Sequence, residues 1–315
     1  MLGATGTIGR ATVSALLRRG HEVVCFVRSN AVQHSGLPDA AILRFGEVAD
    51  PASLARDGFA GEHFDAIVSC LASRTGTPSS AWAIDHKAHC DALAAGHQAG
   101  VSQMVLLSAI CVQKPLLAFQ QAKLAFEQAL IRSGMTYSIV RPTAFFKSLS
   151  GQIDRLRNGK PFLLFGDGQQ TACKPISDAD LGNYLADCLD ETSLQNRILP
   201  IGGPGAAITP RQQGEELFRL LGHRPKFRRV PIGLLDGIIF VLDVLGRVSP
   251  RLRDKAELAR IGRYYATESM LVLDPTTGCY DADATPSTGQ DTLFAHYARL
   301  INGEIANDRG DHAVF

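Results

Sequence analysis

The sequence predicts an α/β fold, in which a doubly wound parallel sheet is followed by a smaller C-terminal α+β lobe. Two observations carry this prediction. A glycine-rich loop near the start leads into a helical pattern and then into a segment rich in β-branched residues. Apolar segments then alternate with helical patterns as far as about residue 140, as expected for parallel strands joined by crossover helices.

The composition excludes several classes of protein. Lys and Arg number 32 against 31 Asp and Glu, so the chain lacks the basic excess of most nucleic-acid binders, and we expect no nucleic-acid partner. The seven cysteines are odd in number and form no Cys-x-x-Cys, which argues against a disulfide framework and a zinc site. With no signal-peptide pattern at the start, a reducing, cytoplasmic location is expected.

The loop that opens the chain is a G-x-x-G-x-x-G motif, and a helical pattern ending near Gly20 and a strand at 22–28 follow it. This order is typical of a Rossmann nucleotide-binding unit. Glycines let the backbone approach a pyrophosphate, and the helix N-terminus offers N–H groups to it. The predicted cofactor-binding residues in this loop are Gly3, Thr5, Gly6, Thr7, Ile8 and Gly9.

The strand that should precede the loop consists of Met1 and Leu2 only. A buried parallel strand usually has about five residues. We therefore expect that the natural start lies upstream of Met1, or that the chain is trimmed.

The end of the second predicted strand, Val27-Arg28-Ser29, indicates which cofactor is bound. NAD-binding units usually place Asp or Glu here to hold the ribose 2′-hydroxyl, whereas an arginine accommodates the 2′-phosphate of NADP. Arg28 supplies that cation and Ser29 a hydrogen-bond donor. The sequence therefore predicts NADPH rather than NADH.

Further strands are predicted at 41–45, 65–71, 104–108 and 136–141, with helices near 51, over 81–100 and over 116–133. Ligands of such sheets bind at the carboxyl ends of the strands. Besides the loop and Arg28, the residues expected around that crevice are Cys70, Leu71, Ala72, Ser108, Pro142 and Thr143.

Two residues at this crevice carry chemistry: Ser108, which ends a strand, and Lys123 on the next helix. The layout resembles the short-chain dehydrogenase/reductase superfamily, whose catalytic set is a Ser followed by Tyr-x-x-x-Lys. Four residues before Lys123, however, stands Phe119, so the usual phenolic acid is missing. A sequence that keeps the lysine but lacks the tyrosine resembles the atypical branch of this superfamily, which includes the NmrA-like and isoflavone-reductase-like proteins.

Six long runs span almost the whole chain and are more specific than the loop: VSCLASR (68–74), VLLSAICVQKPLLAFQQAKLAFE (105–127), TYSIVRPTAFFKSL (136–149), FGDGQQTACKPIS (165–177), LPIGGPGAAITP (199–210) and IGRYYATESMLVLDP (261–275). Together they resemble the family of NADPH-dependent divinyl chlorophyllide 8-vinyl reductases. That family reduces the 8-vinyl group of divinyl chlorophyllide a, or of divinyl protochlorophyllide, to ethyl in chlorophyll and bacteriochlorophyll biosynthesis.

The resemblance implies a C=C reduction in which a hydride from NADPH reaches one vinyl carbon and a proton reaches the other. Because no alcohol oxygen forms, the reaction tolerates Phe119 in place of tyrosine. It implies that Lys123 holds the nicotinamide ribose and takes part in proton delivery. Ser108 is expected to supply an orienting hydrogen bond.

The implied substrate is a Mg-chlorin pigment, which is large, flat and mostly apolar, so its site needs apolar walls and few polar anchors. Phe145, Phe146 and Lys147 follow Pro142 at the mouth of the crevice and are the predicted substrate-binding residues. His86 and His89 stand three residues apart on a helix with no acidic partner in register, so we predict no metal site there.

After residue 150 glycines and prolines punctuate short strands, so we divide the chain into an NADP-binding domain (1–150) and a substrate lobe (151–315). Within the lobe, Thr209-Pro210 predicts a helix start. The apolar segment 230–245 contains two aspartates and is too short to span a membrane. A buried core helix is its commoner interpretation, and lining the pigment cleft or peripheral contact with a photosynthetic membrane are the others.

Two other functions stay open at this stage. One is an NADP(H)-sensing, NmrA-like regulator without catalysis, and the other is an isoflavone-reductase-like alkene reductase that acts on a small substrate. Lys123 and the run at 261–275 argue against the regulator, and the long C-terminal third argues against the second alternative. The oligomeric state does not follow from the sequence.

Overall fold

The computed structural model describes residues 1–29, 36–247 and 249–306. The chain divides into two compact units. The first unit comprises Met1–Ser73, Pro78–Pro142 and Asp178–Pro200. The second comprises Arg74–Thr77, Thr143–Ser177 and the residues from Ile201 on. This division is discontinuous along the sequence, whereas the sequence predicted a single boundary at residue 150.

The first unit is built on parallel strands. β3 (Ala66–Ser69), β4 (Gln103–Leu107), β5 (Thr136–Pro142) and β7 (Arg197–Ile201) form a four-stranded sheet in that order. A second parallel pair joins β1 (Val24–Val27) to β2 (Ile42–Phe45). The strands predicted from the sequence are therefore present, each within a few residues of its predicted bounds.

Met1 and Leu2 connect these two groups of strands. Leu2 bridges in parallel to Phe26 of β1 on one side and to Ser69 of β3 on the other. Its N–H donates to the Val68 carbonyl at 2.9 Å, and its own carbonyl accepts from the Cys70 N–H at 2.9 Å. The resulting order is β2-β1-Leu2-β3-β4-β5-β7, which confirms the predicted doubly wound sheet.

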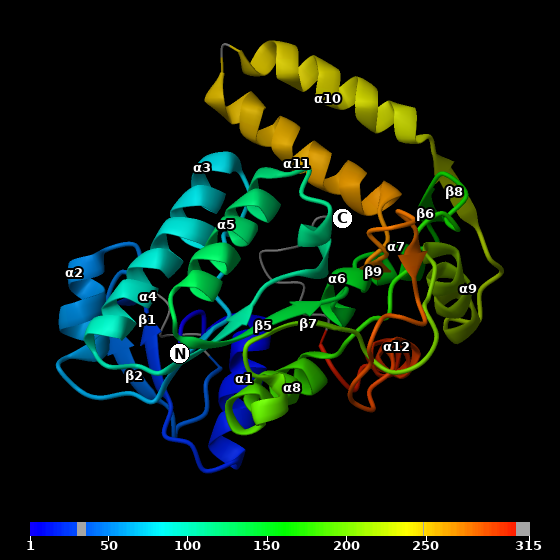
Figure 1. Cartoon of the computed structure of the whole chain (residues 1–315). Helices are drawn as coiled ribbons and strands as arrows, with labels where there is room; N and C mark the ends of the chain where they lie inside the picture. The colour runs from blue at the N-terminus through cyan, green and yellow to red at the C-terminus, as the bar shows by residue number, and fades with distance from the viewer. Residues whose placement is uncertain (30–35, 248, 307–315) are drawn as a thin grey trace. The chain divides into compact units, whose positions relative to one another are not determined.

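Helices cover both faces of this sheet (Figure 1). α1 (Thr7–Arg18) and α8 (Asp178–Asp190) pack together on one side. The other side carries α4 (His89–Gln98) and α5 (Ala118–Arg132), together with α2 (Pro51–Ser53), η2 (Leu54–Phe59) and α3 (Pro78–Ala81). The helix predicted over 81–100 contains a π-helical segment, η3 (Trp82–Ala88), between α3 and α4.

One glycine decides how closely α1 and α8 approach. A Cβ atom added at Gly182 of α8 would lie 2.7 Å from the carbonyl carbon of Ala11 in α1. Since real Cβ contacts are essentially never that short, the backbones of the two helices are in direct contact at this point. This packing explains why α8, which follows residue 150, belongs to the first unit.

The second unit has a core of its own, formed by α6 (Phe146–Leu149), α7 (Ile153–Arg157), α9 (Pro210–Leu220), α12 (Leu293–Ile301) and β6 (Phe162–Phe165). β6 pairs in parallel with β8 (Phe227–Val230), and the short strands β9 (Val272–Leu273) and β10 (Tyr280–Asp281) pair antiparallel. The predicted helix start is confirmed, because the Thr209 side chain accepts a hydrogen bond from the Gln212 N–H and caps α9.

The apolar segment 230–245 forms α10 (Ile232–Gly246), which packs against α11 (Pro250–Thr267) as a helical hairpin. No residue of α10 is buried. The interpretation of this segment as a buried core helix is therefore wrong, because one face of α10 lies on α11 and the opposite face is exposed.

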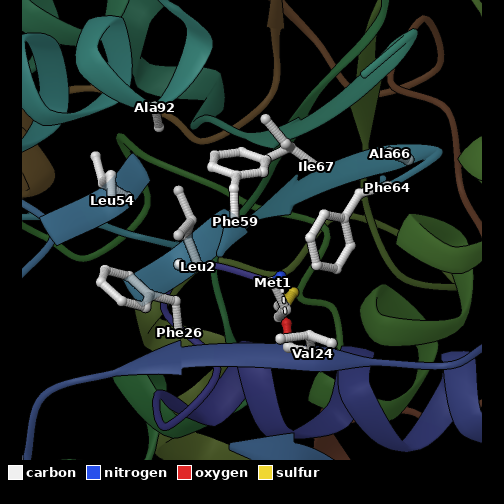
Figure 2. A pocket seen from close by; sticks show the side chains of 11 residues that line it. Met1, Leu2, Val24, Phe26, Leu54, Phe59, Phe64, Ala66, Ile67 and Ala92 are labelled. Carbon is white, nitrogen blue, oxygen red and sulfur yellow. Dashed lines mark hydrogen bonds between the residues drawn. The ribbon is translucent and has the colours of Figure 1, made fainter. Parts of the chain in front are cut away.

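Figure 2 shows a small apolar pocket beside Met1 and Leu2 in the first unit. Val24 and Ala66, which begin β1 and β3, line it together with Phe59 and other apolar side chains. The pocket therefore lies at the amino ends of the strands, opposite the edge at which a nucleotide is expected.

The contact at Gly182 generates a stability prediction. Gly182→Ala forces α8 away from α1 and should lower the free energy of unfolding by about 1–3 kcal/mol, the usual cost of overpacking. Gly237→Ala in α10 is the matched control, because its Cβ would meet nothing within 4 Å. That variant should gain about 0.5–1 kcal/mol from alanine's higher helix propensity. Urea titration of both variants measures the difference, and equal effects would contradict the close helix contact.

Candidate active site

The carboxyl ends of the parallel strands in the first unit bring most of the predicted residues to one edge. The glycine loop follows Leu2, Arg28 and Ser29 follow β1, and Cys70 to Ala72 follow β3. Ser108 follows β4, and Pro142 ends β5. In-register parallel pairing of these strands places their ends on the same side. The cofactor role of each residue stays a prediction.

The glycine loop is packed tightly enough to exclude side chains at two positions. Gly3 has a φ of +70°, and a Cβ there would lie 2.5 Å from the Cys70 carbonyl carbon. A Cβ on Gly9 would lie 2.1 Å from the Gly3 carbonyl oxygen. Gly6 differs, because it is exposed and its Cβ would meet nothing closer than 3.5 Å. The loop is therefore closed on its inner side and open to a ligand at Gly6.

The start of α1 suits an anionic ligand. Gly6 is the N-cap residue and provides no side-chain cap, and the first turn of the helix contains no acidic residue. The N–H groups of a first helical turn lack carbonyl partners within the helix and carry its positive dipole end. Arg10, in that turn, donates from Nη1 to the Thr5 carbonyl oxygen at 3.2 Å, so a cation lies beside the loop. A dinucleotide pyrophosphate fits these donors.

Arg28 and Ser29 are both exposed at the end of β1. An exposed guanidinium at this position can form charge-assisted hydrogen bonds with a phosphate on the adenosine ribose. These two residues fit a phosphorylated ribose better than a free 2′-hydroxyl, for which a carboxylate is the usual partner.

Cys70 is a structural neighbour of the loop. Its Sγ lies 3.7 Å from the Thr12 hydroxyl, which accepts from the Cys70 thiol because its own proton is donated to the Ile8 carbonyl. Burial raises the pKa of the Cys70 thiol to about 12, so the thiol is neutral at physiological pH. A neutral thiol is a poor nucleophile, so Cys70 can contact a cofactor by packing but not by covalent chemistry.

Lys123 forms a buried ion pair that the sequence analysis did not predict. Its Nζ lies 3.0 Å from Oδ1 of Asp85 in η3, and the side chains are 11% and 1% exposed. The Ser73 N–H also donates to the Asp85 carboxylate at 3.4 Å. The pair joins α5 to the π-helical segment and holds a single cation close to the carboxyl end of β3.

A second buried polar contact lies beside this pair. His89 Nδ1 lies 2.9 Å from the Ile84 carbonyl oxygen, which can only accept, so Nδ1 carries the proton and Nε2 accepts from Ser69 Oγ at 2.8 Å. Burial, and then the Lys123 charge, lower the pKa of His89 to about 4. The imidazole is therefore neutral at pH 7 and holds the end of β3 against α4.

Ser108 donates its hydroxyl proton to a buried carboxylate. Ser108 Oγ lies 2.5 Å from Oε1 of Glu127, and Arg141 forms a bidentate pair with the same carboxylate. Glu127 is fully buried, one helical turn after Lys123. With its proton engaged, Ser108 presents acceptor lone pairs rather than a donor to a ligand.

A third buried polar side chain, Gln120, lies on the same face of α5 as Lys123 and Glu127. Gln120 is fully buried, its Oε1 accepts from the Leu117 N–H at 2.9 Å, and its Nε2 has no hydrogen-bond partner among the residues that the structure describes. Gln120, Lys123 and Glu127 recur at intervals of three and four residues and share one helix face. A buried amide donor without a partner fits a site that completes its hydrogen bonds with a ligand.

The remaining predicted residues belong to the second unit. Thr143 donates its hydroxyl to the Lys174 carbonyl, and Phe145 pairs as an isolated bridge with Ile176. Phe146 is buried in the core of that unit and packs against His296. Phe145 and Lys147 are only partly buried, so they present more surface to a ligand than Phe146 does.

Five functional candidates were missed by sequence reasoning: Arg10, Asp85, Gln120, Glu127 and Arg141. Asp85 and Glu127 stand in predicted helices, where acidic residues are normally solvated. Their burial has no local signal, because Asp85 pairs with Lys123 and Glu127 pairs with Arg141, and neither pairing is visible in the sequence. The π-helical segment that turns Asp85 inward has no such signal.

The comparisons with known proteins agree with this geometry. Residues 3–192 match the family model described as NAD(P)H-binding, so the chain belongs to the NAD(P)H-binding proteins of the Rossmann class. More narrowly, it is 49% identical over 99% of its length to divinyl chlorophyllide a 8-vinyl-reductase of Zea mays, and 46% identical over 97% to that of Arabidopsis thaliana. It covers 82% and 77% of those two proteins. The chain belongs to the divinyl chlorophyllide a 8-vinyl-reductase family.

Two more distant relatives share the sequence pattern or the fold at lower identity. The photosystem II assembly factor Ycf39 of Synechocystis is 24% identical over 75% of this chain and 71% of its own. The fold resembles that of the NADPH-dependent quinone oxidoreductase QOR2 of Escherichia coli, solved with NADPH, with a TM-score of 0.68 at 18% identity, over 96% of this chain and 99% of that one. The regulator and the small-substrate reductase are not favoured by these relatives.

The Lys123–Asp85 pair predicts strong coupling in stability. Asp85→Asn and Lys123→Met should each lower the free energy of unfolding by about 3–5 kcal/mol, because each leaves one buried charge unpaired. The double variant should lose much less than the sum of the two.

Lys87 and Asp91 provide the matched control, since their ion pair of 2.6 Å is partly exposed on the adjacent helical segments. Lys87→Met and Asp91→Asn should each cost less than about 1 kcal/mol. Denaturant titrations of both cycles give the coupling energies, and additive effects at Lys123 and Asp85 would show that the buried pair does not form.

Proposed function

We propose that this protein reduces the 8-vinyl group of divinyl chlorophyllide a, or of divinyl protochlorophyllide, to an ethyl group with NADPH. The observation that carries the proposal is the 46–49% identity, over nearly the full chain, to plant proteins named for this reaction. The buried Lys123 and the phenylalanine at position 119 agree with it. An alkene reduction leaves no alkoxide to protonate, so it does not need a phenol at that position.

NADPH is proposed as the cofactor because two cations lie where its phosphates are expected. Arg10 lies in the first turn of α1 beside the loop, and Arg28 lies at the end of β1. The first suits the pyrophosphate and the second the 2′-phosphate, which only NADPH carries.

When bound, the nicotinamide supplies the hydride that one vinyl carbon receives. The side chains of the protein hold the cofactor and the pigment in place and deliver a proton to the vinyl group. We assign to Lys123 the nicotinamide ribose hydroxyls and the transfer of a proton toward the other vinyl carbon. Asp85, which accepts from Lys123 Nζ, keeps that ammonium in place and is a positioning residue.

Ser108 is proposed to orient the ligand by accepting a hydrogen bond, since its own proton is donated to Glu127. In the second unit, Phe145 offers an apolar wall for the macrocycle, and Lys147 a cation for a propionate carboxylate. Phe146 supports them from the core. The pigment is mostly apolar, so we also propose that the protein works in peripheral contact with the membrane in which such pigments partition.

A pigment assay tests the proposed reaction. Purified protein mixed with NADPH and divinyl chlorophyllide a should give the monovinyl product by chromatography, and NADH should give much less. Lys123→Met should reduce turnover by at least about 100-fold, within the range ascribed to a positioned acid–base group. Lys87→Met, which removes an exposed lysine, is the control and should retain turnover. If the protein binds NADPH tightly but forms no monovinyl product, the proposed reductase activity is wrong.

Cofactor choice is tested at Arg28. Arg28→Gln removes charge-assisted hydrogen bonds to the 2′-phosphate and should weaken NADPH binding by about 10–100-fold, while NADH binding stays nearly unchanged. Arg56→Gln is the control, because that exposed arginine pairs with Asp57 away from the predicted site. Isothermal titration with both cofactors measures the four affinities. An equal loss for NADPH and NADH would contradict the assigned role of Arg28.

A further inference from the structure

The helix α10 carries a continuous apolar stripe on its exposed face. Leu234, Ile238, Val241 and Leu245 recur at intervals of four, three and four residues, so they line one side of the helix. Phe240, which is 70% exposed, and Val244 border this stripe. Glycines 233 and 237 add no side chains to the same side. Figure 1 shows α10 running beside α11. All four stripe residues are exposed, so the stripe lies on the side of α10 that faces away from α11.

The acidic residues of α10 lie on its other face. Asp243 pairs with Arg260 of α11 at 2.6 Å through both carboxylate oxygens, and Asp236 pairs with Arg263 of the same helix. Both carboxylates are therefore neutralised within the hairpin. The exposed stripe has no charged residue, and an apolar side chain of phenylalanine size that stays exposed is costly in water.

Basic residues flank the stripe at both ends. The segment 223–255 contains eight Lys and Arg against three Asp, and the eight cations are all exposed. Those before the helix are Arg224, Lys226, Arg228 and Arg229, and those after it are Arg247, Arg251, Arg253 and Lys255. An apolar helix face between two cationic clusters is typical of helices that lie in the interface of an anionic bilayer.

We propose that the α10 stripe binds the surface of an anionic lipid bilayer, with Phe240 and its neighbours below the headgroups and the flanking arginines on the phosphates. The inference deepens the proposed function by naming the surface of the peripheral contact and its partner. Within residues 1–29, 36–247 and 249–306, no helix combines the length and the hydropathy that a transmembrane span requires.

Charge and shape favour a lipid bilayer over two other partners of the α10 stripe, a second copy of the chain and a chlorin. A second copy of the chain would bring eight cations against eight cations, and such like-charge contact is unfavourable. A chlorin would need a concave site, whereas this stripe is the convex face of a helix. Lipid phosphates complement the flanks and acyl chains complement the stripe.

The test uses the full chain and vesicles without pigment. The wild-type protein should sediment with vesicles of equal parts phosphatidylglycerol and phosphatidylcholine, and hardly with phosphatidylcholine alone. Arg228→Gln with Arg229→Gln should weaken binding by about 25-fold, at roughly fivefold for each of the two cations near the surface. Ile238→Ser with Phe240→Ser should weaken it at least as much. Added salt should weaken the binding of the wild-type protein.

Ile42→Ser is the matched control for Ile238→Ser, because both isoleucines are 42% exposed and Ile42 lies on the edge strand β2. It should bind vesicles like the wild type. Circular dichroism and thermal unfolding check that each variant is folded. Equal vesicle binding by the wild type and both α10-region variants would overturn the proposal, as would a dimer in sedimentation that the stripe variant abolishes.

Turnover of detergent-solubilised pigment separates this inference from the proposed function. The stripe variant should retain that turnover while it loses vesicle binding. If its turnover falls as well, the stripe holds the pigment and the lipid proposal is wrong. If the wild-type protein reduces pigment without binding vesicles, the proposal fails and the function stands. Vesicle binding without pigment reduction supports the α10 surface and removes the function instead.

Discussion

The buried contact between Lys123 and Asp85 is the constraint on which the candidate site depends. An ammonium and a carboxylate removed from water cost more than their attraction returns unless further hydrogen bonds complete the pair. The Ser73 N–H supplies one such bond, and the π-helical segment η3 turns Asp85 to receive both. A hydrophobic pair would pack there at lower cost, so the pair is better explained by the cation that it holds at the strand ends than by stability.

Two further contacts fix the same edge of the sheet: the packing of the glycine loop on β3 and the hydrogen bonds of Glu127. Met1 and Leu2 join β1 to β3, and the glycine loop that follows them is pressed against the Cys70 backbone, so the loop and the end of β3 are fixed together. One helical turn beyond Lys123, Glu127 ties Ser108 and Arg141 to α5. Buried carboxylates therefore fix the two candidate catalytic residues of the first unit: Glu127 holds Ser108, and Asp85 holds Lys123.

Much of this could be predicted from the sequence. Strand positions, the loop and the placement of Ser108 and Lys123 follow from local periodicity and from the rule that ligands meet the carboxyl ends of parallel strands. Asp85 could not be predicted, because its burial depends on a π-helical turn and on a partner 38 positions away in the chain. The return of α8 to the first unit depends on the backbone contact at Gly182, and the exposure of α10 depends on which helix packs beside it. Such tertiary packing leaves no local signal.

We propose that this site passes a hydride from NADPH to the 8-vinyl group of a chlorin. The most direct measurement is isotope transfer: the protein is given divinyl chlorophyllide a with NADPH deuterated at C4, in separate reactions for the two C4 positions, and the product is weighed by mass spectrometry. We expect one deuterium in the new ethyl group from one of the two labelled cofactors, and none from the other. Monovinyl product without deuterium from either would contradict it.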